Sequence, residues 1–308
     1  MSEAYDVIII GAGPAGLSAA VYTGRARLNT LVLEKGMPGG QILLADFVEN
    51  YPGFPEGAVP FELMGNFRKH AEKFGAKIAT DEVKEIRKKD SLWNVVGNKD
   101  EYSTKTVIVA TGSIYSKLGV PREEELTGKG LSYCATCDGA FFKDKEVGVV
   151  GGGDNALTEA LFLTKFCKKV TIIHRRDQLR AEKILQERAL ANGKIDILLD
   201  AIVQEIQGEE RFESILVKNV KTNEISQLKF DGLFVSIGTD PNTGFVKGFL
   251  DLDEREKIKV GISMTTSQAG IFAAGDVTNA CPEQMAIAVG SGVIAALAAD
   301  EYVDNLEQ

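Results

Sequence analysis

The sequence predicts an α/β protein built from two similar domains, with the second domain inserted into the first. Three observations support this fold class. A glycine-rich strand–turn–helix motif occurs twice, beginning at residues 5 and 146. Each motif is followed by a second apolar strand that ends in glycine, 101 and 87 residues after the first motif glycine. A last strand and a long apolar helix, from residue 270 onward, have no motif of their own, and we expect them to complete the first domain.

The first motif has the order expected of a dinucleotide-binding unit. Tyr5–Ile10 (YDVIII) reads as a buried strand, GAGPAG follows at residues 11–16, and residues 17–28 read as a helix. A second strand ends at Glu34, 23 residues after the first glycine. The glycines permit a tight turn, close approach of a pyrophosphate and close helix packing, and Glu34 can accept hydrogen bonds from ribose hydroxyls. The alternative is that GAGPAG is a purely structural turn.

The second motif differs at the position that reads the ribose. The segment GGGDNA at residues 151–156 separates a strand from a helix, and His174 occupies the position that corresponds to Glu34. A basic cluster at this position would bind a 2′-phosphate, whereas a carboxylate suits a ribose with free hydroxyls. The alternative is that HRRDQLRAEK is the solvated start of a helix. The candidate residues of this second site are Gly151, Gly153, Asp154, Asn155, Ala156, His174, Arg175, Arg176 and Arg180.

The two motifs therefore predict two different dinucleotides. The first would lack a ribose phosphate, as FAD does, and the second would carry one, as NADPH does. A hydride donor paired with a flavin indicates a redox enzyme.

The composition of the 308-residue chain limits the classes of protein to which it can belong. The net charge is −9 and no long basic run is present, so we expect no nucleic-acid surface. The apolar run VIIIGAGPAGLSAA follows Glu3 and Asp6 rather than a basic segment, which argues against a signal peptide. No uncharged stretch reaches the ~18 residues of a membrane span. We expect a cytoplasmic protein with no membrane association.

A C-x-x-C pair, Cys134 and Cys137, lies in the segment YCATCDG. Such a pair can bind a metal, staple a fold or carry electrons. A reducing cytoplasm weakens the second interpretation. Zinc needs about four ligands, and the other cysteines and the histidines are scattered along the chain. With a flavin and a nicotinamide expected nearby, we favour a redox-active disulfide and no metal, because this spacing commonly lowers one thiol pKa.

Four further residues could have either a chemical role or an ordinary structural one. Asp138 follows the pair and is placed to supply a proton that disulfide reduction consumes; the alternative is a helix cap. Cys167 lies in the apolar run LFLTKFCKKV, so we expect core packing. Cys281 precedes a proline in a loop, and we expect a bystander thiol. His70 is expected on an exposed helix face.

Short alternating runs, KIATDEVKEIRKKDSLWNVVG (77–97) and FESILVKNVKTNEISQLKF (212–230), predict antiparallel meanders. The resulting fold class is two Rossmann-like (three-layer ββα) nucleotide-binding domains. We expect an FAD domain of residues 1–116 and 244–308 and an NADPH domain of residues 117–243, with linkers near 114–121 and 239–244.

Eight segments in order now point to one family. They are GAGPAG, PGGQ (38–41), VENYPGF (48–54), VIVATGS (107–113), YCATCDG, GGGDNA, HRRDQLRA (174–181) and GIFAAGDVT (270–278), and they span nearly the whole chain. The sequence resembles the bacterial low-molecular-weight thioredoxin reductases, which are class II pyridine nucleotide-disulfide oxidoreductases.

This resemblance implies a homodimeric FAD enzyme that uses NADPH to reduce thioredoxin, with an NADPH domain that rotates between two states. Hydride would pass to the flavin and then to the Cys134–Cys137 disulfide. Cys137 would face the flavin, Cys134 would attack thioredoxin, and Asp138 would act as acid and base. The implied FAD residues are Gly11, Gly13, Pro14, Ala15, Gly16, Glu34, Lys35, Gly40, Gln41, Asn50, Val83, Thr111, Gly112, Gly275, Asp276, Gln284 and Met285. For Asp276 alone, a turn or cap role is the alternative.

Three positions depart from the family pattern. Glu283 stands where the family usually has arginine, which removes a positive charge expected near the flavin. Asn155 replaces the usual Ser or Thr, and Thr158 replaces a usual Glu.

Two other functions compete with this reading. One is a flavin reductase of the same fold with another donor or acceptor, either ferredoxin-dependent or peroxiredoxin-linked. The basic cluster argues against loss of NADPH use, and the peroxiredoxin-linked enzymes usually carry an extra N-terminal redox domain. The other is a non-catalytic nucleotide-binding redox sensor, which turnover with a disulfide acceptor would exclude.

Overall fold

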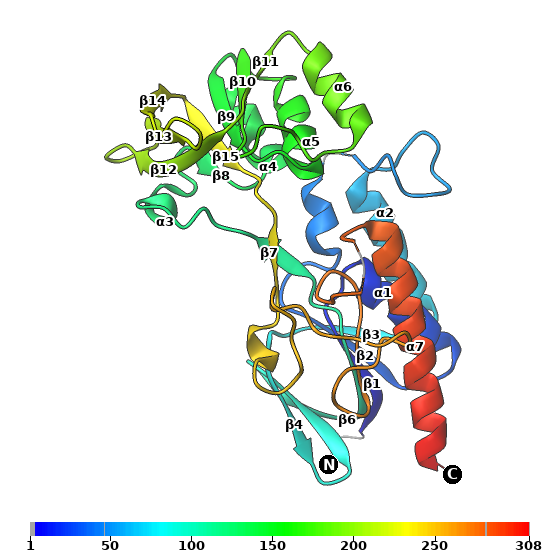
Figure 1. Ribbon diagram of the computed structural model, residues 1–308. Helices are drawn as coiled ribbons and strands as arrows, with labels where there is room; N and C mark the ends of the chain where they lie inside the picture. Colours follow the sequence, from blue (N-terminus) through cyan, green and yellow to red (C-terminus); the bar gives the residue numbers. More distant parts are fainter. Residues whose placement is uncertain (1–3, 46, 281, 308) are drawn as a thin grey trace. The chain divides into compact units, whose positions relative to one another are not determined.

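The computed structural model describes residues 4–45, 47–280 and 282–307. The chain forms two compact units, Met1–Ile114 with Asp240–Gln308 and Tyr115–Thr239 (Figure 1). Each unit is an α/β structure with a parallel sheet and an antiparallel meander. The predicted fold class, with one nucleotide-binding unit inserted into another, is therefore confirmed.

The first unit has a seven-stranded sheet in the order β3-β2-β1-β6-β5-β4, and β17 also pairs with β6. The long strand β6 serves two parts of this sheet. Its first half, residues 101–104, pairs antiparallel with β5, and its second half, residues 107–109, pairs in parallel with β17. The strands are β1 (Tyr5–Ile10), β2 (Thr30–Glu34), β3 (Lys77–Thr80), β4 (Val83–Lys89), β5 (Leu92–Gly97), β6 (Glu101–Val109) and β17 (Ile271–Ala273).

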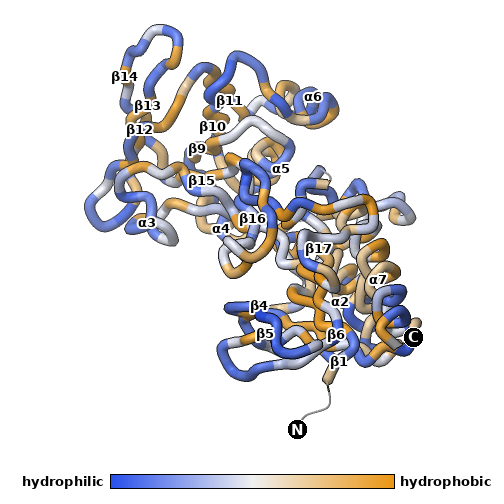
Figure 2. The backbone as a smooth tube through the Cα atoms, turned by 60° about the horizontal axis from the view of Figure 1, so that its bottom comes forward, coloured by the Kyte–Doolittle hydropathy of each residue, from blue (hydrophilic) through white to orange (hydrophobic). Residues whose placement is uncertain are grey.

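Three helices accompany this sheet: α1 (Pro14–Arg25), α2 (Pro60–Lys73) and α7 (Met285–Glu307). Helices α1 and α7 share one apolar core, to which α1 contributes Leu17 and Ala20, and α7 contributes Ala295 and Ala299. Figure 2 shows the largely apolar colouring of α7 and the hydrophilic strand β4, in which only one residue is buried. Two short 3₁₀ turns, η1 (Gly40–Leu44) and η3 (Gly244–Val246), complete the unit.

Helix α7 is long and apolar enough, by length and composition, to cross a membrane over Met285–Leu306. Core helices of soluble proteins pass the same test, which makes this weak evidence for a span. Ala288, Ala295, Ala296 and Ala299 lie buried in the core shared with α1. Packing within the first unit therefore explains part of the apolarity of α7, while Ile294 and Leu297 remain exposed.

The second unit repeats the plan with a five-stranded sheet in the order β11-β10-β9-β15-β8, in which every neighbouring pair is parallel. A separate antiparallel sheet, β12-β13-β14, corresponds to the antiparallel meander that β4, β5 and the first half of β6 form in the first unit. The strands are β8 (Leu131–Ser132), β9 (Glu146–Val150), β10 (Lys169–Ile173), β11 (Ile195–Leu198), β12 (Ala201–Gln207), β13 (Ser214–Asn219), β14 (Ile225–Lys229) and β15 (Gly232–Val235). The helices are α3 (Glu123–Leu126), α4 (Ala135–Asp138), η2 (Gly139–Phe142), α5 (Asp154–Leu163) and α6 (Lys183–Ala191).

The structure corrects one prediction from the sequence and adds detail to another. The meander predicted over residues 77–97 is wrong at its start, because Lys77–Thr80 is β3 and pairs in parallel with β2. This run has only four residues and little of it is buried. Its hydrophobic periodicity therefore cannot distinguish a strand of the parallel sheet from a strand of a meander. The segments expected as linkers contain β7 (Ser113–Tyr115) and β16 (Thr239–Pro241), which pair with each other as a two-stranded sheet.

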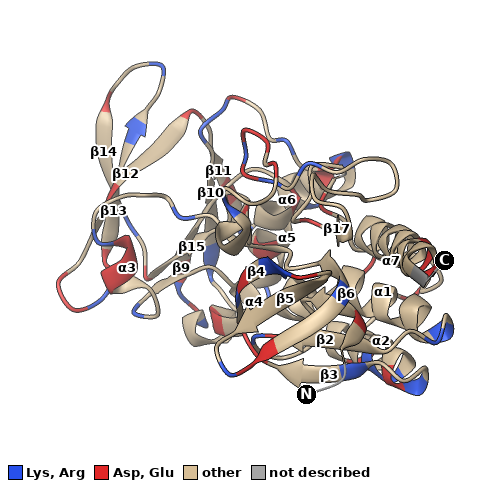
Figure 3. Ribbon diagram, turned by 90° about the horizontal axis from the view of Figure 1, so that it is seen from below, with Lys and Arg blue, Asp and Glu red and all other residues tan. Residues whose placement is uncertain are grey.

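Acidic and basic residues are interspersed along the ribbons of both units (Figure 3). The acidic α3 is the densest single-sign element among the short helices, with Glu123, Glu124 and Glu125 in its single turn. Its Glu123 is nevertheless buried and accepts hydrogen bonds from the Leu118 and Gly119 amides at 2.6 and 2.8 Å. The charge of this residue therefore organises the neighbouring loop.

Gly292 and Gly290 of α7 provide a matched test of the packing against α1. A Cβ at Gly292 would collide with the backbone carbonyl of Ala15, whereas a Cβ at Gly290 would meet nothing within 4 Å. We expect Gly292→Ala to lower the free energy of unfolding by about 1–3 kcal/mol through overpacking. Gly290→Ala should raise it by up to about 1 kcal/mol through helix propensity. Urea denaturation of both variants measures the difference, and equal effects would contradict the described packing.

Candidate active site

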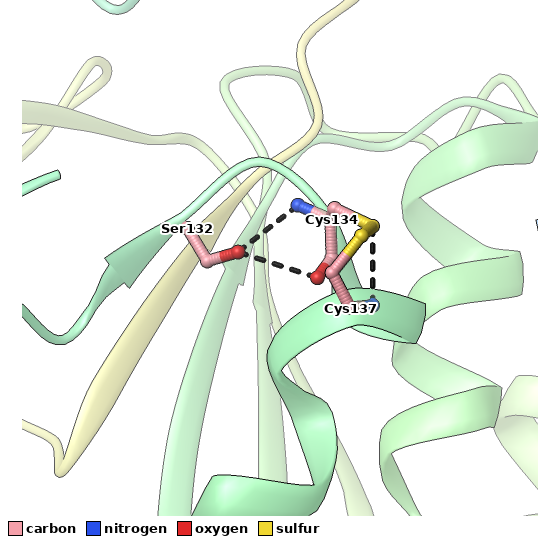
Figure 4. The surroundings of a disulfide bond; sticks show 3 residues. All are labelled: Ser132, Cys134 and Cys137. Atoms are coloured by element: carbon pink, nitrogen blue, oxygen red, sulfur yellow. Dashed lines mark hydrogen bonds between the residues drawn. A yellow bond between two sulfur atoms is a disulfide. The ribbon is translucent and has the colours of Figure 1, made fainter. Parts of the chain in front are cut away.

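A disulfide joins Cys134 and Cys137 directly after β8 (Figure 4). Cys134 caps α4, and its Sγ accepts a hydrogen bond from the Cys137 amide at 3.1 Å. The Ser132 hydroxyl accepts from the Cys134 amide at 3.0 Å and donates to the Cys134 carbonyl at 3.3 Å. Ser132 thus fixes the backbone of the redox pair, a role that the sequence analysis did not assign.

The two sulfur-bearing residues differ in exposure. Cys134 is buried and Cys137 is exposed. Asp138 is half-buried, and its amide donates to the Cys134 carbonyl at 3.2 Å. Within the described residues, no group of three or more His, Cys, Asp or Glu side chains could hold a metal ion. The pair is therefore placed for thiol–disulfide chemistry at an exposed position.

Cys167, the other cysteine among the described residues, takes no part in this site. Cys167 is fully buried in the core of the second unit, which confirms the expected packing role. Burial raises the pKa of its thiol to about 11, so it is a poor nucleophile at neutral pH. Cys281 lies outside the described residues. His70 is exposed on α2, as expected.

The first glycine-rich loop is shaped by Glu34 at the end of β2. The Glu34 carboxylate accepts from the Ala12 amide at 2.8 Å and from the Gly36 amide at 3.0 Å. Gly11 has a φ of +105°, and a Cβ there would collide with the Ala110 carbonyl. No side chain of the described residues caps α1, whose N-cap is Gly13. The first turn of α1 therefore offers backbone N–H groups to an anion.

Several residues expected around the first dinucleotide are joined by contacts. The Gln41 amide donates to the Ser113 carbonyl, and the Asn50 amide donates to Gln284 at 3.1 Å. The Thr111 hydroxyl donates to the Asn242 carbonyl at 2.9 Å, and Asn242 returns a bond to the Thr111 carbonyl at 2.9 Å. Gly40 packs against Gly13, and Gly275 against Ala15. Further expected residues are Gly112 after β6, Met285 at the start of α7, the exposed Lys35 and Val83 at the start of β4.

Asp276 is a half-buried carboxyl between opposite charges. Burial raises its pKa to about 6, the Glu283 carboxylate adds to this rise, and Lys257 opposes it. Lys257 forms an ion pair with Glu283 at 2.7 Å and is itself largely buried. Glu283, which departs from the family pattern, is therefore paired with a lysine that belongs to no recognised motif.

The second glycine-rich loop is held by the segment that follows β10. The Gly152 carbonyl accepts from the Arg180 amide at 2.6 Å and from the Ala181 amide at 3.2 Å. This brings the basic segment beside the motif. Gly151 packs against Ala156, and Asp154 accepts from the Glu182 amide at 2.7 Å. The N-terminal turn of α5, like that of α1, has no side-chain cap within the described residues.

The basic cluster is divided between buried and exposed groups. His174 is buried against Gly152, and burial together with the neighbouring arginines lowers its pKa. A neutral imidazole therefore supports the loop. Arg175, Arg176 and Arg180 are exposed, and no ion pair engages them within the described part of the chain. Asn155, the second residue of α5, is exposed as well.

Comparison with known proteins identifies the family. The family model described as pyridine nucleotide-disulphide oxidoreductase matches residues 5–292. The chain belongs to this family. Members use a flavin and a pyridine nucleotide, and the two uncapped glycine-rich helix starts described above suit two dinucleotides.

Relatives of this family member are similar over nearly their full length. Thioredoxin reductase of Bacillus subtilis is 47% identical over 99% of this chain and 96% of the relative. Thioredoxin reductase of Streptomyces coelicolor is 46% identical over the same shares. The solved thioredoxin reductase of Lactococcus lactis, in the FR conformation, has a TM-score of 0.95 and 43% identity, covering 98% of this chain and 99% of that one. These similarities confirm the predicted resemblance and an oxidoreductase function with a disulfide redox centre.

The raised pKa of Asp276 predicts a pH dependence of stability. In protein stripped of flavin, this group stabilises the fold fully below its ordinary pKa of 3.8 and loses that contribution as the pH rises through about 6. The loss is at most about 3 kcal/mol. Asp276→Asn should remove it, and Asp251→Asn, an exposed change in the same unit, should not. Urea denaturation between about pH 4 and 7 tests this; parallel profiles for wild type and Asp276→Asn would refute it.

Proposed function

We propose that the protein is a thioredoxin-disulfide reductase that takes electrons from NADPH through FAD. The observation that carries this proposal is the partly exposed Cys134–Cys137 disulfide in the same unit as the second dinucleotide motif. A disulfide with this exposure, in the unit that carries the second dinucleotide motif, suits electron delivery to another protein's disulfide. The names of the relatives support thioredoxin as that protein.

We assign one dinucleotide to each unit from the residues at the position that would contact its ribose. Glu34, at the end of β2, suits an unphosphorylated ribose, which favours FAD in the first unit. Its two backbone hydrogen bonds leave it fixed and oriented toward the loop. The exposed Arg175, Arg176 and Arg180 suit a 2′-phosphate, which favours NADPH in the second.

When bound, the flavin would supply two-electron transfer between the nicotinamide and the disulfide. The chain's own part begins with Cys134 and Cys137, whose S–S bond breaks as it gains two electrons. Asp138 would supply a proton to one sulfur as the dithiol forms. The dithiol then exchanges with the disulfide of thioredoxin, which leaves reduced thioredoxin and the original disulfide.

The resemblance assigns attack on thioredoxin to Cys134, but exposure favours the other sulfur. Cys137 is exposed and Cys134 is buried in the oxidised protein. Trapping a mixed disulfide with thioredoxin in Cys134→Ser and in Cys137→Ser separates these assignments. Rapid trapping in Cys134→Ser alone would assign the attack to Cys137.

We further propose a cytoplasmic homodimer. The cytoplasm fits a catalytic rather than a structural disulfide. Exposed apolar side chains on α1 and α7, Tyr22, Ile294 and Leu297, support a second copy as partner. Analytical ultracentrifugation tests the dimer, and a monomer at micromolar concentration would refute it.

An anaerobic titration tests the function. NADPH should bleach the flavin absorbance, and oxidised thioredoxin should restore it as thioredoxin thiols appear. Cys137→Ser should still bleach with NADPH but reduce no thioredoxin. If NADPH leaves the wild-type flavin oxidised, the donor assignment fails, and a ferredoxin-type donor takes its place.

The arginine cluster predicts coenzyme preference. Arg175→Ala with Arg176→Ala should lower kcat/KM for NADPH by roughly 10²-fold and leave NADH little changed, because each charge-assisted hydrogen bond contributes about 1.5–3 kcal/mol. Lys183→Ala, another exposed cation of the same unit, is the matched control. An unchanged NADPH/NADH ratio in the double variant would show that the phosphate site lies elsewhere.

A further inference from the structure

Glu159 belongs to α5, which packs against the segment that carries the redox disulfide, and it has no part in the relay described above. Ala135, the residue that follows Cys134 and begins α4, shares one apolar cluster with Ala156 and Ala160 of α5. The Ala135 amide is close enough to the Glu159 carboxyl to favour its charged form. The Glu159 carboxyl therefore lies near the segment that closes the disulfide.

This carboxyl is poorly solvated. Its Oε2 atom is buried and has no hydrogen-bond partner among the described residues. The Ser236 hydroxyl lies close to the carboxyl, yet its oxygen is also buried and lacks a well-oriented partner in that same set. No lysine or arginine of the described chain forms an ion pair with Glu159. Such surroundings favour the neutral acid, and burial raises the pKa of Glu159 to about 8.

The groups that face Glu159 come from three elements. They are the Ala135 amide of α4, the Ser236 hydroxyl after β15, and Tyr115 of β7. Burial raises the pKa of Tyr115 to about 12, and Glu159 adds to this rise, so the phenol stays neutral. Tyr115 in turn stacks on Tyr133, with ring centroids 6.3 Å apart. Among the described residues, α4, β7 and β15 carry no lysine or arginine that could offset an ionised Glu159, and α4 adds the carboxyl of Asp138.

Reduction of the disulfide creates negative charge next to this group. The S–S bond breaks, two electrons enter the sulfurs, and any sulfur that takes up no proton becomes a thiolate. A like charge nearby disfavours a thiolate. We propose that Glu159 is a positioning residue that keeps its proton while the Cys134–Cys137 pair is reduced, so that the thiolate forms beside a neutral group. This inference rests on the redox role of the pair in the proposed function.

The proposal has a specific pH signature. Below about pH 8, Glu159 is neutral in the oxidised protein, so Glu159→Gln changes little. Above that pH the oxidised protein carries an ionised Glu159. Reduction must then draw a proton onto Glu159, so that the thiolate still forms beside a neutral group. This proton uptake disfavours reduction in the wild type and is absent in Glu159→Gln.

The experiment equilibrates the flavin-loaded protein with mixtures of reduced and oxidised dithiothreitol from pH 6.5 to 9.5. Two reductant thiols become a disulfide as the protein disulfide opens, which supplies both electrons and both protons. Acid quenching, alkylation and peptide mass spectrometry then report the reduced fraction of Cys134 and Cys137. The matched control is Glu187→Gln, an exposed charge removal on α6 of the same unit.

We expect equal equilibrium constants for wild type and Glu159→Gln at pH 6.5. At pH 9.5 the variant should be reduced at a roughly tenfold lower ratio of reduced to oxidised dithiothreitol, as expected for removal of a nearby like charge. Glu187→Gln should follow the wild type throughout. A constant offset at every pH would indicate a purely structural role for Glu159 and would overturn the proposal, as would coincident profiles.

A second measurement covers the case in which Glu159→Gln does not fold. The infrared difference spectrum of wild type, oxidised minus reduced, at pH 9 should show a protonated carboxyl band that shifts with ¹³C-glutamate labelling. Its absence would overturn the proposal. Neither measurement uses thioredoxin or NADPH, so a failed thioredoxin assay with an intact pH signature would count against the proposed function alone.

Discussion

The first unit depends on how closely backbone segments approach the start of α1. Gly16 lies on the carbonyl of Gly11, Gly292 of α7 lies on the carbonyl of Ala15, and Gly275 lies against the Ala15 side chain. At the first two of these contacts a Cβ would meet another backbone group. The loop, the helix and the C-terminal helix can therefore share one small volume only because glycine occupies the contact points. These contacts surround the first turn of α1, which no side chain of the described residues caps.

Hydrogen bonds within the protein hold both glycine-rich loops. Glu34 holds the Ala12 amide, and the Gly152 carbonyl holds the Arg180 segment in place. Because these loops are fixed by internal hydrogen bonds, little ordering would accompany binding of a dinucleotide. The ion pair between Lys257 and Glu283 has a similar effect at Asp276, since it limits the negative charge that this carboxyl meets.

The sequence was sufficient for features that local patterns encode. The strand at Tyr5–Ile10 matches its prediction to the residue, and Cys134 and Cys137 pair as expected. Long-range contacts could not be predicted from the sequence. Neither the Asn242 contact with Thr111 nor the Ala135 contact with Glu159 joins residues that share a motif. His174 was grouped with its arginines by spacing, but strand β10 ends one residue before it and directs it into the interior. Periodicity could not assign Lys77–Thr80 to the parallel sheet, because that decision depends on which strand lies next to it.

The order of elements along the chain also sets an order of folding. The inserted unit, Tyr115–Thr239, is continuous, whereas the first unit receives β17 and α7 only from the last residues of the chain. Since domains fold as units during synthesis, the inserted unit can complete its core while the first still lacks one strand and the helix against α1. A nascent chain truncated before Ile271 should accordingly resist proteolysis in residues 115–239 and not in residues 5–110; equal protection of both would exclude this order. Quality control of the newly made protein would then act chiefly on a half-built first unit.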